Sequence, residues 1–191
     1  MNGAELKERI VGALSVAECD ALADIAAATK AVRALEVGHY LGLSTAVLLE
    51  ALPYGCELVT VDHHYGDQWC PSTQVAAFEE NVDPFIGDRP FSFLNDDMVS
   101  ALPTLPGGFG FVFYDADHTA EAVAAFWVAV EPLLAERCTL VFDDADWADQ
   151  STLRGLAEGS GFRVVTGRPF HRGDHDKHDP TTYTLEVMER G

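Results

Sequence analysis

The spacing of apolar positions changes several times along the chain. In the first 30 residues apolar side chains recur every three or four positions, which predicts two leading helices near 4–14 and 16–28. Ser15 stands before the second helix with Glu18 three residues later, which is the spacing of a capping box. From residue 31 onward, short β-rich runs alternate with helical stretches. This alternation predicts a doubly wound α/β fold with a mainly parallel sheet.

Seven runs have the composition of strands. The predicted strands are 31–37, 56–61, 91–94, 109–114, 138–142, 162–166 and 181–188. The predicted helices between them are 46–52, 72–82, a short piece ending at 102, 120–134 and 149–159. The last two strands flank a polar, turn-rich insert at 170–180, FHRGDHDKHDP, so we expect them to form a terminal antiparallel hairpin.

This insert holds three histidines at four- and three-residue spacing, His171, His175 and His178. On a helix they would suit a metal site, but Gly173 and Pro180 favour a solvated hairpin loop. The role of the insert stays open.

The stretch 34–45, ALEVGHYLGLST, joins the first predicted strand to a helix through two glycines. Gly38 and Gly42 supply backbone freedom, and the N–H groups of the first helical turn point at whatever binds there. Dinucleotide-binding turns have the spacing G-x-G-x-x-G, whereas this one is G-x-x-x-G with Glu36 two residues before it. A small ligand is the expected occupant, and a glycine turn without a ligand is the alternative.

The chain is predicted to form one domain, 1–191, with leading helices at 1–30 and a core at 31–191. It has 48% apolar residues and no linker-like stretch.

A charged N-terminus and the lack of a long apolar run predict a cytoplasmic protein without a membrane segment. With 31 acidic against 12 basic residues, nucleic acid and anionic membranes are poor partners. A homodimer is left open. No C-x-x-C spacing occurs, so we expect reduced thiols at Cys19, Cys56, Cys70 and Cys138.

Asp62 ends the second predicted strand, 24 residues after Gly38. A carboxylate at this place in an α/β nucleotide fold accepts from two ribose hydroxyls, so we assign Asp62 to the ribose, with an ordinary turn residue as the alternative. The loop at 63–73 follows, and His63 is expected beside adenine. Its Tyr65, Asp67 and Trp69 would face the acceptor, or Trp69 would pin the loop to the body. A zinc site at His63, His64 and Cys70 lacks a fourth ligand with suitable spacing.

Three more carboxylates follow neighbouring predicted strands, Asp115 after the fourth and Asp143 and Asp144 after the fifth. The carboxyl ends of parallel strands meet at one edge of the sheet, so these side chains are expected to converge there with the glycine turn. Unpaired carboxylates would repel one another, whereas a divalent cation would neutralise them. The alternative is that Asp143 and Asp144 form only a turn.

The string E-x-G-x-x-x-G-x-S-T resembles the first motif of class I S-adenosylmethionine-dependent methyltransferases, in particular the small O-methyltransferases related to the catechol and caffeoyl-CoA enzymes. The resemblance covers about 36–144 and implies a seven-stranded sheet of order 3-2-1-4-5-7-6. It implies that Glu36 accepts from the methionine amino group and that Tyr40 and Ser44 contact the methionine end. The turn residues Gly38, His39 and Gly42, together with Asp62, His63 and Asp115, complete the implied cofactor set.

The same resemblance places Asp97 and Met98 beside adenine, although relatives carry a small residue where Met98 stands. It also implies that Asp115, Asp143 and Asp144 bind the metal, with His118 in place of a lysine that is the candidate base. Asp144 replaces a usual asparagine. A branch that methylates sugar hydroxyls and natural products keeps D-x-x-H and acidic pairs, and this chain is more similar to that branch.

The sequence therefore predicts a methyltransferase that uses S-adenosylmethionine and Mg²⁺ to methylate a hydroxyl of a small-molecule acceptor. Catechol, sugar and polyketide hydroxyls all remain open. His118 is the predicted general base, and we expect a helix N-terminus and a nearby cation to keep its imidazole neutral, with an ionisation near or below about pH 6.5. The alternatives are a non-catalytic S-adenosylmethionine-binding or scaffold protein and a metal-independent methyltransferase.

Overall fold

The computed structural model describes residues 1–63, 71–144, 150–171 and 182–191, and its elements alternate between strand and helix for most of the chain. The strands are β1 Arg33–Val37, β2 Glu57–Asp62, β3 Phe91–Asn95, β4 Phe109–Tyr114, β5 Leu134–Phe142, β6 Arg163–His171 and β7 Thr182–Arg190. The helices are α1 Gly3–Arg9, α2 Val16–Ala28, α3 Leu43–Ala51, α4 Pro71–Ile86, α5 Met98–Ala101, α6 Ala120–Val130 and α7 Gln150–Gly159, with 3₁₀ turns at Leu102–Thr104 and Glu131–Leu133.

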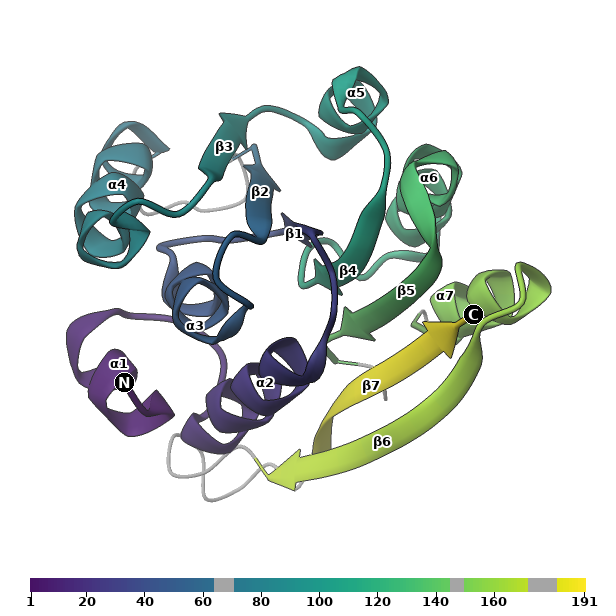
Figure 1. Cartoon of the computed structure of the whole chain (residues 1–191), viewed down its shortest axis with the longest axis horizontal. Coiled ribbons are helices and arrows are strands. Elements are labelled where there is room, and N and C mark those ends of the chain that lie inside the picture. Colours follow the sequence, from purple (N-terminus) through teal and green to yellow (C-terminus); the bar gives the residue numbers. More distant parts are fainter. Residues whose placement is uncertain (64–70, 145–149, 172–181) are drawn as a thin grey trace.

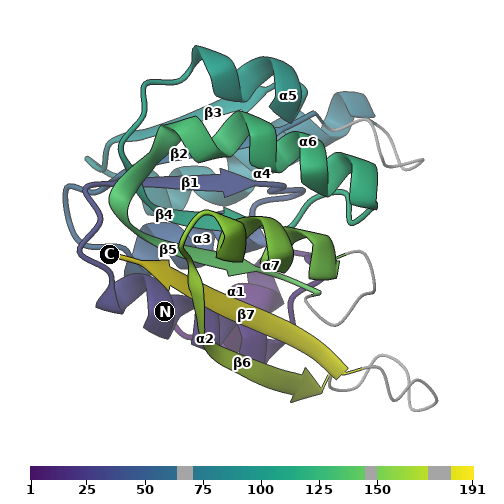
Figure 2. The same cartoon turned by 90° about the vertical axis from the view of Figure 1, so that its right-hand side faces the viewer.

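The strands form one sheet in the order β3-β2-β1-β4-β5-β7-β6, which confirms the predicted topology. β1 to β5 are parallel, while β7 pairs antiparallel with both β5 and β6. Figure 2 shows the long β6–β7 pair at its edge of the sheet. Both strands extend beyond the predicted ranges.

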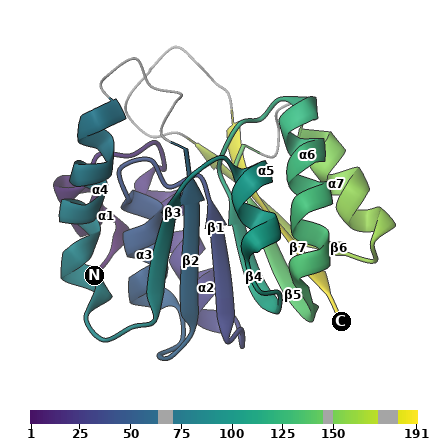
Figure 3. The ribbon, with the colours of Figure 1, turned by 90° about the horizontal axis from the view of Figure 1, so that it is seen from above.

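Helices cover both faces of the sheet, as Figures 1 and 3 show. Side chains of α1 to α4 pack with Phe111, Phe113 and Val141 into one buried cluster, and those of α5 to α7 pack with Val112 and Leu140 into another. Because β1 and β4 lie in the middle of the sheet, their side chains are buried on both faces, which accounts for their continuous apolar runs. Within the described residues, no helix has the length and apolarity needed to cross a membrane.

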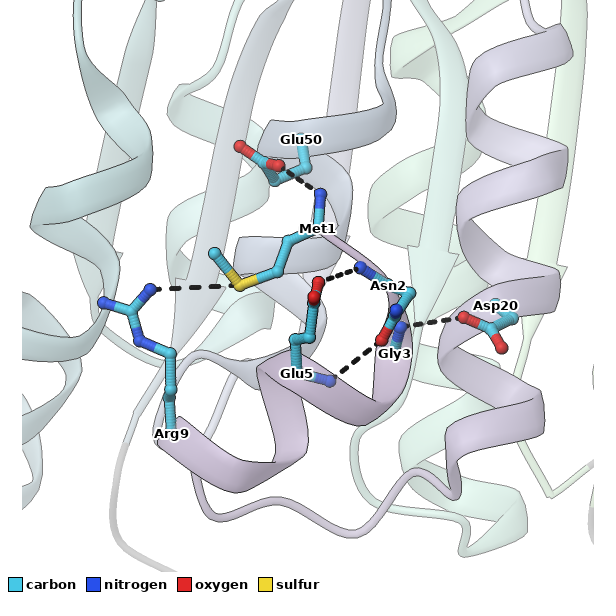
Figure 4. A network of polar contacts seen from close by, with 7 residues as sticks. All are labelled: Met1, Asn2, Gly3, Glu5, Arg9, Asp20 and Glu50. Atoms are coloured by element: carbon cyan, nitrogen blue, oxygen red, sulfur yellow. Dashed lines mark hydrogen bonds and ion pairs between the residues drawn. The ribbon is translucent and has the colours of Figure 1, made fainter.

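The N-terminal helices are fixed by polar contacts that the sequence pattern only partly predicts. Both begin with a capping box, Asn2 with Glu5 in α1 and the predicted pair, Ser15 with Glu18, in α2. Figure 4 shows the first of these, beside the hydrogen bond from the Gly3 N–H to Oδ1 of Asp20 on α2 and the ion pair between the N-terminal amine and Glu50 on α3. These contacts tie α1 to its two neighbours.

The predicted ends of α1 and α6 are wrong for local reasons, and α4 continues to Ile86, past its predicted end at residue 82. α1 stops at Arg9 instead of residue 14, because the Lys7 ammonium donates to the carbonyl oxygens of Gly12 and Leu14 and turns this segment back. α6 stops at Val130 instead of residue 134, because Pro132 cannot continue the backbone hydrogen bonding and a 3₁₀ turn follows. β5 consequently begins at Leu134, earlier than predicted.

Three of the four cysteines are buried free thiols, as predicted: Cys19, Cys56 and Cys138. Burial raises the pKa of Cys19 and Cys138 to about 12 and that of Cys56 to about 11, so these thiols are inert near neutral pH. Cys70 lies outside the described residues, as do His64, Tyr65, Asp67, Trp69 and most of the histidine-rich insert.

Candidate active site

A cavity of about 720 Å³ opens at the carboxyl edge of the sheet. It is lined by segments far apart in sequence: the 11–14 linker before α2, the 38–41 turn after β1, the end of β2, residues 96–99 after β3 and residues 115–117 after β4. This is the ligand edge of open α/β sheets, at the point where the strand order reverses between β1 and β4. Of the predicted cofactor residues, the cavity is lined by Gly38, His39, Tyr40, Ser44, Asp62, His63, Asp97, Met98 and Asp115.

The two glycines of the turn are required by its geometry. Gly38 has φ +88°, and a Cβ there would lie 1.9 Å from the carbonyl oxygen of Asp115. Gly42 has φ +92°, and its Cβ would lie 2.5 Å from Cγ2 of Val82 on α4. Between them Tyr40 has φ +44°, a strained conformation for a bulky residue. The turn is therefore pressed against both β4 and α4, and Gly42 acts through packing instead of lining the cavity.

Asp62 is bound to the glycine turn. Its Oδ2 accepts hydrogen bonds from the backbone N–H groups of His39 and Tyr40, both at 2.9 Å. The carboxylate thus holds the turn that follows β1 and also lines the cavity. Its assignment to the cofactor ribose stays a prediction, and its hydrogen bonds to the turn add a structural role that the sequence did not indicate.

Glu36 lies beneath the same turn and does not line the cavity. Its side chain is fully buried, and its Oε2 accepts a hydrogen bond of 2.6 Å from the Thr45 hydroxyl. Burial raises the pKa of Glu36 to about 7, although the hydroxyls of Ser44, Thr45 and Thr60 act in the opposite direction. Within the described residues its Oε1 has no hydrogen-bond partner. The predicted contact of Glu36 with the methionine amino group stays a prediction.

His39 anchors the turn to the neighbouring elements. Its ring is buried and stacks on Phe78 of α4 with 3.9 Å between centroids, while Phe93 of β3 lies edge-on at 6.4 Å. Because His39 also lines the cavity, the cavity wall is continuous with this aromatic cluster.

The adenine side of the predicted site lies at the start of α5. Asp97 is the N-cap of that helix, and its Oδ1 accepts from the N–H groups of Val99 at 2.9 Å and Ser100 at 3.3 Å. Asp97 is exposed, Met98 is half-buried, and both line the cavity with His63. Their adenine contacts stay predictions.

Asp115, Asp143, Asp144 and His118 come together at the ends of β4 and β5. His118 Nε2 lies 3.2 Å from Oδ2 of Asp144, which is the second residue after β5 and has φ +52°. Burial raises the pKa of Asp115 to about 7, and burial together with the neighbouring carboxylates raises that of Asp143. The clustered carboxylates therefore resist ionising together.

His118 was expected to be kept neutral, and this arrangement shows that expectation to be wrong. Burial lowers its pKa, but the hydrogen bond to Asp144 and the charges of Asp144 and Asp115 outweigh burial and raise the pKa above its ordinary value. His118 also lies outside the helix that it was expected to start, because Thr119 is the N-cap of α6. In the cation-free protein, imidazolium is thus favoured, which is the reverse of the predicted direction.

Glu18 is a fourth carboxylate near this cluster, and sequence reasoning assigned it only a capping role. Glu18 is only 3% exposed, and its Oε2 accepts a hydrogen bond of 2.6 Å from the Ser15 N–H. Its Oε1 is buried without a hydrogen-bond partner among the described residues. Its charge contributes to the raised pKa of both Asp115 and Asp143. α2 leads back to the start of β1, so its first turn lies at the carboxyl edge of the sheet.

The residues fit a divalent cation by donor chemistry but are not grouped tightly around one point. Hard cations take carboxylate oxygens, and Oδ1 of Asp144 is buried without a hydrogen-bond partner in the described part of the chain. Nevertheless, no three histidine, cysteine, aspartate or glutamate side chains among the described residues are close enough together to hold a metal ion.

Comparisons with known proteins agree with the fold. The chain resembles cofactor-bound Rv0187 from MTB, at 22% identity over 97% of this chain and 85% of that one, with a TM-score of 0.70. It also resembles an O-methyltransferase from Bacillus cereus in complex with SAH, at 15% identity over 97% and 86% of the two chains, with a TM-score of 0.69. A third similar structure is the O-methyltransferase TomG from Streptomyces achromogenes, at 19% identity over 92% of this chain and 81% of that one, with a TM-score of 0.65.

At these identities the likeness concerns the fold. No curated protein matches the sequence. A family model described as a methyltransferase domain matches residues 35–145, the segment that contains the glycine turn, Asp62 and the carboxylates after β4 and β5. Because this match spans more than half of the chain, the protein belongs to the methyltransferase-domain family and is a class I S-adenosylmethionine-dependent methyltransferase.

Proposed function

We propose that this methyltransferase transfers the methyl group of S-adenosylmethionine to a hydroxyl oxygen of a small-molecule acceptor. The observation that carries the proposal is the relation between two groups at one edge of the sheet. The turn held by Asp62 lines the cavity together with Asp115, and His118 follows Asp115 by three residues. A cofactor held by the turn would thus have a candidate base beside it.

The reaction is an in-line displacement at the sulfonium methyl carbon. The carbon–sulfur bond breaks with its electron pair staying on sulfur, which leaves S-adenosylhomocysteine, and a carbon–oxygen bond forms to the acceptor. The hydroxyl proton passes to Nε2 of His118, and the cavity holds the oxygen in line with the methyl group. Because the pKa of His118 is raised by Asp144 and Asp115, its neutral, proton-accepting form becomes abundant at a higher pH than that of an ordinary histidine.

Asp115, Asp143 and Asp144 would hold Mg²⁺ or another divalent cation in this proposal. When bound, such an ion neutralises the carboxylates and lowers the pKa of an acceptor hydroxyl. The carboxylates themselves stabilise positive charge at this edge of the sheet. Oδ2 of Asp144 lies 3.2 Å from Nε2 of His118 and orients its imidazole.

A metal-independent methyltransferase is the second candidate, and one observation favours it. Among the described residues no group is arranged to hold a metal ion. In this alternative the carboxylates serve only the cofactor and His118. The alternative of a non-catalytic S-adenosylmethionine-binding protein does not agree with the methyltransferase-domain match.

The choice of a hydroxyl acceptor is supported by the relatives. The Bacillus cereus and Streptomyces achromogenes proteins are O-methyltransferases, and the latter takes part in tomaymycin synthesis.

The proposal is tested with methyl-labelled S-adenosylmethionine and an acceptor collection of catechols, sugars and polyketides, with and without Mg²⁺. Label on an oxygen of one acceptor class supports it, whereas label found only on nitrogen or carbon contradicts it. Label transfer that chelators leave unaffected selects the metal-independent candidate.

A further inference from the structure

One wall of the cavity is a short stretch of chain between two buried anchors. Residues 11–14 lie between α1 and α2 and line the cavity. Ile10 before the stretch and Leu14 at its end are both buried in the core. The stretch itself is neither helix nor strand. Its position therefore depends on contacts from neighbouring elements.

Lys7 supplies one of these contacts. It lies in the last turn of α1, and its ammonium donates hydrogen bonds to the carbonyl oxygens of Gly12, at 3.1 Å, and of Leu14. α1 is itself tied to α2 and α3 by the contacts drawn in Figure 4. The ammonium of Lys7 thus holds two peptide groups of the wall from a fixed helix.

The wall is pressed against the start of α3. A Cβ at Gly12 would lie 2.7 Å from both Cβ and Cδ2 of Leu43, the first residue of that helix, so a larger residue at this position would displace the wall. Leu43 and the next residue, Ser44, also line the cavity. The 11–14 wall therefore continues the surface made by the glycine turn and the first turn of α3.

This wall borders the end of the cavity opposite the predicted adenine contacts. α3 follows β1 in the middle of the sheet, whereas residues 96–99 follow β3 at the sheet edge, two strands away. On the proposed function, Asp62 at the end of β2 serves the ribose. A cofactor that runs from adenine at β3 to ribose at β2 brings its methionine part to β1 and to the 11–14 wall.

We propose that Lys7 is a positioning residue for the cofactor: it holds the 11–14 wall against α3, and the wall confines the methionine part of S-adenosylmethionine. The inference rests on the cofactor half of the proposed function and does not depend on the acceptor. Lys7 does not line the cavity, so it acts through the two carbonyl groups that accept its hydrogen bonds. Without the ammonium the wall occupies its binding-competent position for a smaller fraction of the time, and the apparent affinity falls in proportion.

The test compares two ligands that share adenosine and sulfur, S-adenosylhomocysteine and 5′-methylthioadenosine, because only the first has the amino-acid part. Calorimetry measures the affinity of each for the whole protein, as wild type and as Lys7→Met. We expect the variant to bind S-adenosylhomocysteine about tenfold more weakly, the order of one lost charge-assisted hydrogen bond, and 5′-methylthioadenosine within about twofold of wild type. Unchanged affinity for S-adenosylhomocysteine, or equal weakening of both ligands as a general structural role would cause, overturns the proposal.

Three further variants separate the position of the wall from the stability of the fold. Lys7→Arg keeps a charged donor and should recover most of the affinity for S-adenosylhomocysteine. Gly12→Ala keeps the ammonium but displaces the wall from Leu43, so it should reproduce the selective loss. Lys30→Met makes the same change at an exposed position that does not line the cavity, and both affinities should stay at wild-type values.

Thermal unfolding checks that each variant is folded. Should Lys7→Met not fold, Gly12→Ala decides the question, since normal binding of S-adenosylhomocysteine by this variant means that the wall does not govern affinity and the proposal fails. Failure of the proposed function gives different results. A wrong cofactor site leaves the wild type without affinity for S-adenosylhomocysteine, and a wrong acceptor class leaves all these affinities as expected while no oxygen is labelled.

Discussion

The imidazole Nε2 of His118 lies 3.2 Å from Oδ2 of Asp144, so the residue before the N-cap of α6 is paired with the second residue after β5. The contact joins the ends of two neighbouring parallel strands at the cavity edge. A base that is oriented by a carboxylate is a common arrangement in enzymes that remove a proton from a hydroxyl. The same carboxylate also stabilises imidazolium, so it orients the base and raises its pKa, and a smaller share of His118 is neutral at low pH.

His118→Ala should reduce turnover by about a hundredfold or more, because the acceptor proton then has no positioned base. S-adenosylmethionine affinity, measured by calorimetry, should stay within a few-fold of wild type, since His118 does not line the cavity. Turnover within a few-fold of wild type, measured with the correct acceptor, would show that His118 is structural.

Asp62→Ala should weaken both the cofactor and the fold. The variant loses two hydrogen bonds that Oδ2 accepts from the turn, each at 2.9 Å, so the free energy of unfolding should fall by roughly 1.5–3 kcal/mol. Urea unfolding measures this loss. The control is Asp88→Ala, which removes an exposed carboxylate paired with Tyr54 and should change stability far less. Equal losses in the two variants contradict the role of Asp62 in holding the turn.

The cofactor-free protein should lose stability as pH rises from about 4.5 to about 7. Burial raises the pKa of Glu36 from 4.5 to about 7, so the folded state binds more protons than the unfolded state in this range, and stability falls with rising pH. Asp115, whose pKa burial raises to about 7, acts in the same direction. For Glu36 alone the pKa difference corresponds to roughly 3 kcal/mol.

Glu36→Gln isolates this contribution, because the amide oxygen can still accept from Thr45 while no charge has to be buried. Urea unfolding between pH 4.5 and 8 should show a flatter pH dependence for the variant and a higher stability at pH 8. An unchanged slope would mean that Glu36 is ionised in the folded protein throughout this range.

Glu18→Gln should raise the free energy of unfolding near pH 8 by roughly 1–2 kcal/mol, because one buried charge near Asp115 and Asp143 disappears. Glutamine at this capping-box position keeps the hydrogen bond to the Ser15 N–H.

The matched control for Glu18 is Glu5→Gln, which makes the same change in the capping box of α1, where the glutamate is exposed (Figure 4). It should alter stability by no more than about 0.5 kcal/mol. If Glu18→Gln is as neutral as Glu5→Gln, the charge of Glu18 does not act on the cluster.

Local signals were sufficient for the turn and for the class of fold. Gly38 and Gly42 have the backbone conformations that the strand-to-helix turn requires, and the alternation of strands and helices predicts a mainly parallel sheet, whereas the order of its strands was implied by the resemblance to the methyltransferases. The end of α1 could not be predicted in this way, because it depends on Lys7 reaching the carbonyl of Gly12 across a loop. A periodicity argument has no information about such a contact.

The electrostatics of the site were beyond sequence reasoning for a related reason. The pKa of His118 depends on Asp144, which is distant in the chain, and on how deeply the pair is buried. Likewise, Glu18 has a capping-box pattern that an exposed helix would also have, and only its burial near β4 and β5 distinguishes it from Glu5. A buried oxygen without a partner is a property of the fold, so no sequence motif marks it.

The central claim is that the cavity beside the glycine turn binds S-adenosylmethionine with the help of Asp62. Calorimetric titration of the wild type and of Asp62→Ala with S-adenosylmethionine, and of the wild type with NAD, tests it most directly. The account predicts S-adenosylmethionine binding by the wild type, clearly weaker binding by the variant, and no measurable heat with NAD. Binding of NAD with no response to S-adenosylmethionine, or equal S-adenosylmethionine affinity in the two proteins, would contradict it.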